Sequence, residues 1–311
     1  MSWVSLMRRR GIEPVEEAEL GAKTTYRVGG RARAAIEVRS KEEFSRIAAA
    51  LGELDEPVPV LVLGNGSNML VSDRGFEGLV VTLNRRSFGG IEIDEGNAAT
   101  VGSAVALPVA ARRVSSLGLA GLAWGVGIPG SVGGAVRMNA GGHGSSIGEV
   151  LKEAFVADLA AGGEVMVRPA GRLHLGYRHS GISATEVVVE ATFALTPGDP
   201  AELGRLIDEI VSWRREHQPG GQNAGSVFQN PPDTAAAALI EEAGLKGLRY
   251  GSAQVSPRHA NFIQADSGGQ AEDVYALIQV VQAEVAKRFG IELGLEVELV
   301  GFSGTRSGEA R

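Results

Sequence analysis

The sequence predicts an α+β protein of three domains and a short tail. Its 311 residues exceed the length of one ordinary compact domain. Helix and strand periodicities alternate near the N-terminus, short apolar strands with frequent glycines fill the middle, and amphipathic helices dominate the C-terminal third. We therefore place the domains at residues 1–84, 85–200 and 201–302, and expect the tail, 303–311, to be disordered.

The first domain begins with a helix signal followed by two strand signals. Ser40 and Glu43 fit a capping box at the start of a helix with an apolar face. Apolar runs at 59–63 and 79–83 predict two strands, the first of them buried. The glycine-rich sequence GNGSN (64–68) lies between these runs and is expected to form an exposed turn.

The second domain is predicted to consist mostly of sheet and loop. Short strands are expected at 91–93, 100–105 and 187–195, with one helix near 108–117. The sequence TPGDP (196–200) predicts a linker, because two prolines and a Gly-Asp pair are unsuited to the interior of regular elements.

The third domain contains three helix signals and a final strand. The first helix has an apolar face from Leu203 to Val211, the second has Asp233 as its N-cap, and the third ends before Gly290. The last strand, 295–300, alternates apolar residues with glutamates and contains Glu296.

The composition excludes several functional classes. A net charge of -7 argues against a general nucleic-acid binder, because neutralising phosphates requires a basic face. The absence of cysteine excludes disulfides, thiolate zinc sites and cysteine nucleophiles, so redox chemistry would need a bound cofactor. The histidines show no metal-site spacing, and we expect no metal. The start, MSWVSLMRRR, lacks the order of a secretory signal, and glycines with Pro129 interrupt the uncharged stretch 114–136, so we expect a cytoplasmic protein.

Glycine is concentrated in two loops. The chain holds 44 glycines, and the densest sequences are GNGSN and GVGIPGSVGG (125–134). Successive glycine amides can close on a phosphate, so two such loops suit a pyrophosphate, although tight turns explain either loop taken alone. Gly125, Gly127 and Gly130 also match GxGxxG. We reject a dinucleotide fingerprint there, because the following glycines are not expected to sustain a helix.

Three polar residues lie in unusual sequence surroundings. Arg178 follows a tyrosine, Ser226 follows a glycine turn, and Glu296 lies in the last predicted strand. Each taken alone is more often structural, as a surface arginine, a turn serine or a solvent-facing glutamate.

Eight ordered motifs extend over nearly the whole chain. They are TTYRVGG (24–30), LGNGSNMLV (63–71), IPGSVGG (128–134), MNAGGHG (138–144), YRHSG (177–181), AGSVFQNP (224–231), HANFI (259–263) and LEVELVG (295–301). In this order the motifs resemble those of the UDP-N-acetylenolpyruvoylglucosamine reductase (MurB) family, and specifically its shorter second type.

The resemblance implies a fold, two cofactors and a reaction. The first two domains would form an FAD-binding module of the vanillyl-alcohol-oxidase type, and the third a C-terminal α/β domain that binds the substrate. The implied activity is NADPH-dependent reduction of UDP-N-acetylglucosamine enolpyruvate to UDP-N-acetylmuramate through bound FAD, for peptidoglycan and cell-wall synthesis. The protein is expected to be a monomer. The alternatives are a flavin oxidase that uses oxygen and a flavin or nucleotide-sugar binding protein without turnover.

The resemblance also assigns roles to the polar residues. Arg178 would stabilise negative charge that develops on the substrate carboxylate, Ser226 would protonate the alpha carbon, and Glu296 would assist as a proton-bearing partner. The family pattern often has other residues where this chain has His143 and Trp124, so flavin or nicotinamide contacts can differ there.

The remaining expected site residues bind cofactor or substrate. Tyr177, Arg214, Gln229 and Asn230 are candidates for contacting the UDP-sugar. The FAD phosphates are expected at the backbone of Gly64, Asn65, Gly66, Ser67, Asn68, Pro129, Gly130, Ser131, Gly133 and Gly134.

Overall fold

The computed structural model describes residues 2–302, which form two compact units. Among these residues, the first unit comprises 2–17, 33–65 and 78–213, and the second comprises 18–32, 66–77 and 214–302. Each unit is thus assembled from segments that are distant in sequence. The tail expected to be disordered, 303–311, lies outside the described residues. The three predicted domain boundaries remain a prediction.

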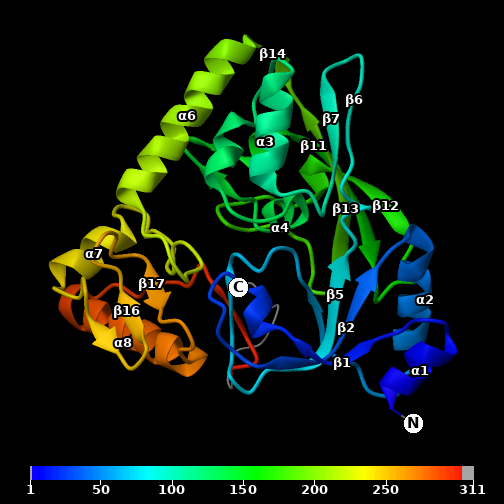
Figure 1. Ribbon diagram of the computed structural model, residues 1–311, viewed down its shortest axis with the longest axis horizontal. Coiled ribbons are helices and arrows are strands. Elements are labelled where there is room, and N and C mark those ends of the chain that lie inside the picture. The colour runs from blue at the N-terminus through cyan, green and yellow to red at the C-terminus, as the bar shows by residue number, and fades with distance from the viewer. Residues whose placement is uncertain (1, 303–311) are drawn as a thin grey trace. The chain divides into compact units, whose positions relative to one another are not determined.

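The first unit contains most of a four-stranded sheet with helices beside it (Figure 1). The strand order is β1 (Val15–Glu19), β2 (Arg31–Val38), β5 (Phe76–Leu83) and β3 (Val60–Val62). Strands β3 and β5 pair in parallel. Helices α1 (Trp3–Arg9) and α2 (Lys41–Gly52) bury apolar side chains in a core that also receives Val187 and Val189. Burial of this apolar area stabilises the sheet and its helices together.

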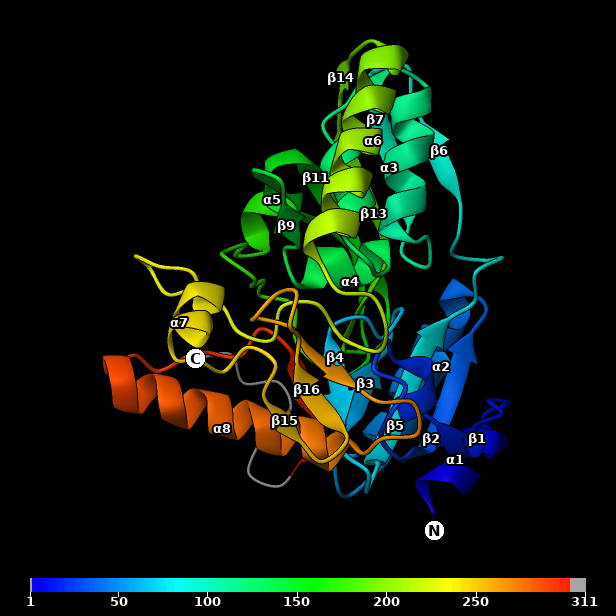
Figure 2. The ribbon, with the colours of Figure 1, turned by 60° about the vertical axis from the view of Figure 1, so that its left-hand side comes forward.

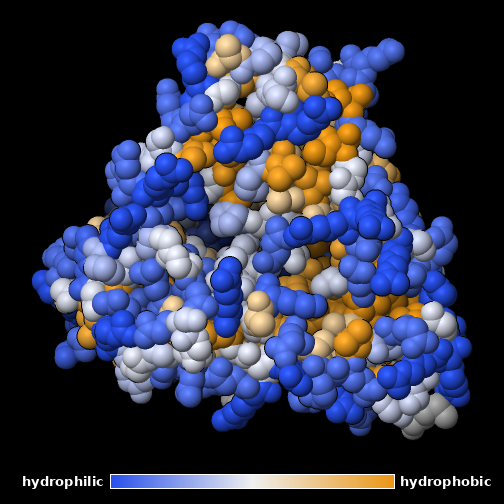
Figure 3. Space-filling view, in the orientation of Figure 1, coloured by the Kyte–Doolittle hydropathy of each residue, from blue (hydrophilic) through white to orange (hydrophobic). Residues whose placement is uncertain are grey.

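A five-stranded antiparallel sheet forms the rest of the first unit's framework. Its order is β12 (Val165–Pro169), β11 (Leu151–Asp158), β13 (Glu186–Ala194), β7 (Ala98–Gly102) and β6 (Ile91–Ile93). Helix α3 (Leu107–Ser116) packs into the core of this sheet, and Figure 3 shows hydrophobic side chains at the surface over α3, which contributes the exposed Val109. The shorter elements are β8 (Leu119–Ala120), η2 (Ala123–Gly127), α4 (Val132–Arg137), β9 (Gly141–Gly142), β10 (Ser145–Ser146), α5 (Ile147–Val150), η3 (Ala170–Arg172) and β14 (Thr196–Pro197).

The second unit packs two helices around small sheets. Strand β4 (Met69–Val71) pairs in parallel with β18 (Glu298–Val300). Strands β15 (Arg249–Tyr250), β16 (Ala253–Val255) and β17 (Ile263–Ala265) form a second sheet, and α8 (Ala271–Phe289) lies beside it (Figure 2). Helix α7 (Ala236–Glu242) and η1 (Gly21–Lys23) complete the unit. Apolar residues from all three sequence segments share one core.

Most predicted elements are confirmed. The helix expected near 108–117 is α3, and the helix expected to end before Gly290 is α8. Gly290 has φ +69°, the left-handed conformation that commonly ends a helix at glycine. In α6 (Pro200–His217), Leu203, Ile207 and Ile210 of the predicted apolar face are buried, whereas Leu206, expected on the same face, is 43% exposed.

The predicted linker at 196–200 is wrong. Thr196 and Pro197 form β14, which pairs with β8, and Pro200 is the first residue of α6. Proline is tolerated in the first turn of a helix, where its missing N–H would have no intrahelical partner, and at the edge of a small sheet.

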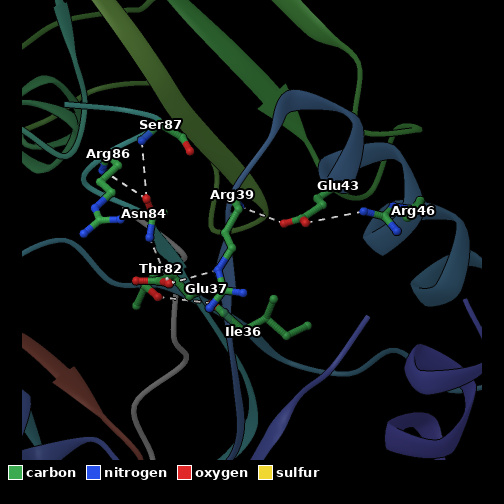
Figure 4. Close-up of polar contacts among 9 residues, drawn as sticks. All are labelled: Ile36, Glu37, Arg39, Glu43, Arg46, Thr82, Asn84, Arg86 and Ser87. Carbon is green, nitrogen blue, oxygen red and sulfur yellow. Dashed lines mark hydrogen bonds and ion pairs between the residues drawn. The ribbon is translucent and has the colours of Figure 1, made fainter. Parts of the chain in front are cut away.

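Two predicted helix caps are also wrong. Ser40 does precede α2, but its side chain makes no capping hydrogen bond. Glu43 instead accepts the backbone N–H of Arg39 at 2.7 Å and pairs with Arg46 (Figure 4). Asp233 does not cap α7, because the helix begins at Ala236 and its first N–H donates to the Asn230 side chain at 3.1 Å.

None of the helices in the described part of the chain combines the length and the apolar character needed to cross a bilayer. The stretch 114–136 instead contains the end of α3, then β8, η2 and most of α4.

Candidate active site

The two glycine-rich loops meet inside the first unit. Gly64 follows β3, and a Cβ placed on it would lie 2.4 Å from Ser131 Oγ. Because real Cβ atoms do not approach so closely, only glycine allows Ser131 to lie against this position. Gly64 of GNGSN therefore adjoins the second loop.

The second loop differs from its prediction in what surrounds it. Its first three residues, 125–127, belong to the 3-10 helix η2, and the short helix α4 begins within it at Val132. The glycines sustain this helix because Ser131 acts as its N-cap, its side chain accepting the N–H of Gly134. The expectation that no helix follows was wrong. The rejection of a dinucleotide fingerprint still holds, since that motif needs a preceding strand.

Both loops have backbone donors available for a ligand. The N–H groups of Asn65 and Gly130 donate no hydrogen bond to any residue within 2–302. In the second unit, Gly66 has φ +60°, and a Cβ there would lie 2.8 Å from Thr24 Cα. Packing against Thr24 is therefore enough to explain the glycine at position 66. The backbone N–H groups of Asn65 and Gly130, by comparison, are suited to bind a pyrophosphate.

Arg178 lies at the tip of a tight turn in the first unit. Gly176 and His179 exchange backbone hydrogen bonds of 2.9 and 3.2 Å, which leaves Tyr177 and Arg178 at the turn. Arg178 has φ +53°, a strained conformation for a residue with a side chain. Its guanidinium lies 5.3 Å from the centre of the Tyr177 ring, and Nη1 lies close to Gly141.

Hydrogen bonds connect this turn to α4 and hence to the second glycine loop. The buried Asn139 donates through Nδ2 to the carbonyl of Gly176 at 2.7 Å and accepts the N–H of Gly148 at 2.8 Å. Ser180 Oγ donates to the carbonyl of Arg137, at the end of α4. The Arg137 guanidinium in turn donates to the carbonyl of Ile182 at 3.0 Å. The loop and Arg178 thus share one rigid framework.

Ser226 and Glu296 are brought together in the second unit. The N–H of Glu296 donates to the carbonyl of Val227, the neighbour of Ser226, at 2.8 Å. Asn68 lies on the other side of Glu296, donating through Nδ2 to its carbonyl at 2.9 Å. Glu296 was predicted within the last strand, but β18 begins at Glu298, so Glu296 lies just before it.

Asn261 holds this arrangement and was not predicted. Its side chain is buried, accepts the N–H of Phe228 at 2.9 Å and donates to the carbonyl of Phe228 at 2.8 Å. Its own carbonyl accepts the N–H of Val227. Its place in the HANFI motif is the signal that could have suggested a role.

The candidate UDP-sugar residues differ in their surroundings. Tyr177 is 57% exposed at its turn. Burial lowers the pKa of the Arg214 guanidinium, and no carboxylate within residues 2–302 pairs with it. The Asn230 side chain is engaged in capping α7, and the backbone N–H of Gln229 donates to Gly294 at 2.9 Å.

Trp124 and His143, the two residues that depart from the family pattern, are both packed against other groups. The indole of Trp124 is buried, and its N–H donates to the carbonyl of Gly121 at 3.0 Å. The His143 ring meets the Trp213 ring edge to face at 5.3 Å. No group of three potential metal-ligating side chains occurs in the described residues.

Comparison with known proteins decides the family. Residues 32–167 match a model described as an FAD binding domain, and residues 216–300 match the C-terminal domain of UDP-N-acetylenolpyruvoylglucosamine reductase. A reductase of that name from Carboxydothermus hydrogenoformans is 41% identical over 95% of this chain and 97% of its own length. This chain belongs to the UDP-N-acetylenolpyruvoylglucosamine reductase family.

Further similarities agree with this assignment. UDP-N-acetylenolpyruvoylglucosamine reductase 2 from Symbiobacterium thermophilum is 40% identical over 94% of this chain and 92% of its own length. The crystal structure of the Thermus caldophilus reductase has a TM-score of 0.79 and 34% identity, covering 93% of this chain and 98% of that one. The predicted α+β fold, with an FAD-binding module and a C-terminal domain, is confirmed. The chain is an FAD-dependent oxidoreductase of this reductase family.

Proposed function

We propose that this protein reduces UDP-N-acetylglucosamine enolpyruvate to UDP-N-acetylmuramate with NADPH, through bound FAD, as a step of peptidoglycan precursor synthesis in the cytoplasm. One observation carries the proposal: the loop 129–134 and the Arg178 turn share one hydrogen-bonded framework. A redox cofactor and a cation for an anionic substrate would thereby be held on the same support.

FAD would be held by the backbone of residues 64–68 and 129–134. The contact between Gly64 and Ser131, and the unused N–H groups of Asn65 and Gly130, fit a ligand rich in phosphate oxygens. The bound cofactor would supply the hydride chemistry, and the protein would supply binding, orientation and electrostatics.

Arg178 would stabilise the negative charge that develops on the substrate carboxylate. The strained turn supports this role, because such backbone conformations cluster where a side chain must be aimed. The bonds from Asn139 and Ser180 hold the turn before substrate arrives, so little reorganisation would be needed at the moment of reaction.

Ser226 would donate the proton that completes the reduction at the alpha carbon, and Glu296, as a proton-bearing partner, would help Arg178 stabilise the developing negative charge. A serine hydroxyl is a weak acid in water, so this step depends on accurate placement beside a strongly basic carbon. The hydrogen bonds of the buried Asn261 and the bond between Glu296 and Val227 hold the backbone next to Ser226, which supports this role.

The nucleotide part of the substrate would bind the third predicted domain and adjoining residues. Arg214 is the best supported of these, since a partly buried guanidinium without a carboxylate partner in residues 2–302 suits a diphosphate. Tyr177 offers an exposed ring at the same turn as Arg178. Gln229 and Asn230 would contribute through their side-chain amides.

Anaerobic absorbance spectroscopy of the purified protein tests the proposal. NADPH is expected to bleach the flavin bands, and UDP-N-acetylglucosamine enolpyruvate is then expected to restore them without oxygen. NADH and UDP-N-acetylglucosamine serve as controls. Bleaching by NADPH that only oxygen reverses would indicate an oxidase instead, and a flavin that NADPH leaves oxidised would indicate a binding protein. Sedimentation of the same sample tests the expected monomer.

A further inference from the structure

A turn carrying two arginines follows β5 in the first unit. Asn84 closes it, since its Oδ1 accepts the N–H groups of Arg86 at 3.0 Å and Ser87 at 3.3 Å. Its Nδ2 donates to Glu37 Oε2 at 3.0 Å, which ties the turn to β2 (Figure 4). An asparagine that bonds the backbone two and three residues ahead fixes the local conformation.

The other end of the turn is anchored in the core. Phe88 is buried, and its ring lies 5.9 Å from that of Phe44. A Cβ on Gly89 would lie 2.1 Å from the carbonyl oxygen of Arg85, so the chain can close here only with glycine. Arg85 and Arg86 are exposed between these two anchors, on a support that does not depend on their own side chains.

Arg85 reaches the first glycine loop, and Arg86 has no such contact. Arg85 Nη2 lies 3.5 Å from Asn65 Oδ1, beside the unused N–H of Asn65. Other arginines of this unit form ion pairs, Arg39 with Glu37 at 3.3 Å and Arg46 with Glu43 at 3.4 Å. Among residues 2–302, no carboxylate pairs with Arg85. In a chain of net charge -7, this leaves a positive group beside the loop.

We propose that Arg85 binds the pyrophosphate of FAD, turning toward the phosphate oxygens from its position beside Asn65. The inference rests on the proposed role of residues 64–68 as a cofactor loop. Backbone amides carry only partial charges, and a guanidinium adds a full charge with paired donors matched to phosphate geometry. Arg86, on the same turn without a contact to that loop, contributes no direct bond.

Flavin binding to the full-length protein tests the assignment, with flavin fluorescence as the readout. After the bound cofactor is removed, the protein and its R85A and R86A variants are titrated with FAD and with riboflavin, which has no phosphate. R85A is expected to weaken FAD binding about tenfold, the size of one charge-assisted hydrogen bond. Riboflavin binding should change less than about twofold, and R85K should restore part of the loss for FAD.

R86A is the matched control, because it removes the same charge from the same turn. A loss in R86A equal to that in R85A would overturn the assignment, since it would show a diffuse charge effect. Equal weakening of FAD and riboflavin in R85A would overturn it as well, since it would show damage to the loop. If R85A binds FAD like the unaltered protein, the inference fails while the proposed function stands. If the unaltered protein binds no FAD, the proposed function fails with it.

Discussion

At the scale of single residues, Ser226 gives the sharpest prediction. S226A should leave reduction by NADPH unchanged and slow reoxidation by the enolpyruvyl UDP-sugar by about 10²-fold or more, because only the second half reaction needs its proton. Stopped-flow absorbance under anaerobic conditions measures both steps. S226C, which retains an acidic proton, should recover part of the rate. Equal reoxidation rates in S226A and the unaltered protein would remove Ser226 from the mechanism.

Tyr26 makes a prediction about stability rather than catalysis. Its side chain is fully buried, burial raises the pKa of its hydroxyl, and that hydroxyl has no hydrogen-bond partner among residues 2–302. An unsatisfied buried hydroxyl costs about 1–3 kcal/mol. Y26F should therefore leave the free energy of unfolding unchanged or raise it by about 1 kcal/mol. Urea unfolding measures this, with the half-buried Tyr275 changed to phenylalanine as the comparison, and a clear loss in Y26F would reveal a partner for the hydroxyl.

The residues that carry the proposed chemistry and those that position them differ in how far sequence predicts them. Arg178 and Ser226 stand in motifs with unusual local composition, so the resemblance located them. The side-chain amides of Asn139 and Asn261 form hydrogen bonds with backbone groups 37 and 33 positions away, and no local sequence pattern indicates such partners. Arg85 was missed for the same reason, because its contact with Asn65 arises only when β3 and β5 pair.

At the scale of elements, helix α7 depends on a cap that local sequence rules misplace. N230A should lower the free energy of unfolding by about 1 kcal/mol, since it removes the acceptor for the first N–H of α7. N230D keeps an acceptor oxygen and should cost less. D233A should have little effect, because the Asp233 side chain does not cap the helix. Chemical denaturation of the three variants measures the differences, and a larger loss in D233A than in N230A would contradict the structure.

Element types were predictable where one periodicity dominated, and their ends were not. Helices α3 and α8 follow the apolar spacing of the sequence and end where expected. At the starts of α2 and α7, several nearby side chains could accept a hydrogen bond from the backbone, and the sequence does not show which one does. Ser40 and Glu43 satisfy the spacing of a capping box, but Glu43 bonds Arg39 instead. Hydrogen bonds to the competing acceptors within one turn differ in free energy by only a fraction of the energy of one hydrogen bond. The sequence pattern alone therefore does not show which acceptor is used.

At the scale of the whole molecule, His259 connects pH to stability. Burial, followed by the charge of Lys246, lowers the pKa of His259, and His259 Nδ1 accepts the N–H of Asn261 at 3.3 Å. Below pH about 6.5 the unfolded chain takes up a proton that the folded chain resists, so stability falls as pH decreases. Unfolding free energies at pH 7.5, 6.5 and 5.5 should therefore decline less in H259Q than in the unaltered protein. H174Q, in the first unit, is the comparison, and parallel declines in both variants would exclude His259 as the cause.

The order in which the chain is synthesised limits when the core of the second unit can form. Its core combines Tyr26, Val28 and Leu70 with side chains of α7 and α8, and β4 finds its parallel partner only at residues 298–300. A fragment that starts at residue 214 would lack those three side chains and that strand. During synthesis, the apolar side chains of segments 18–32 and 66–77 cannot reach their partners in this core until almost the entire chain has emerged from the ribosome. The segments that are synthesised first would therefore need the protection of chaperones for the longest time.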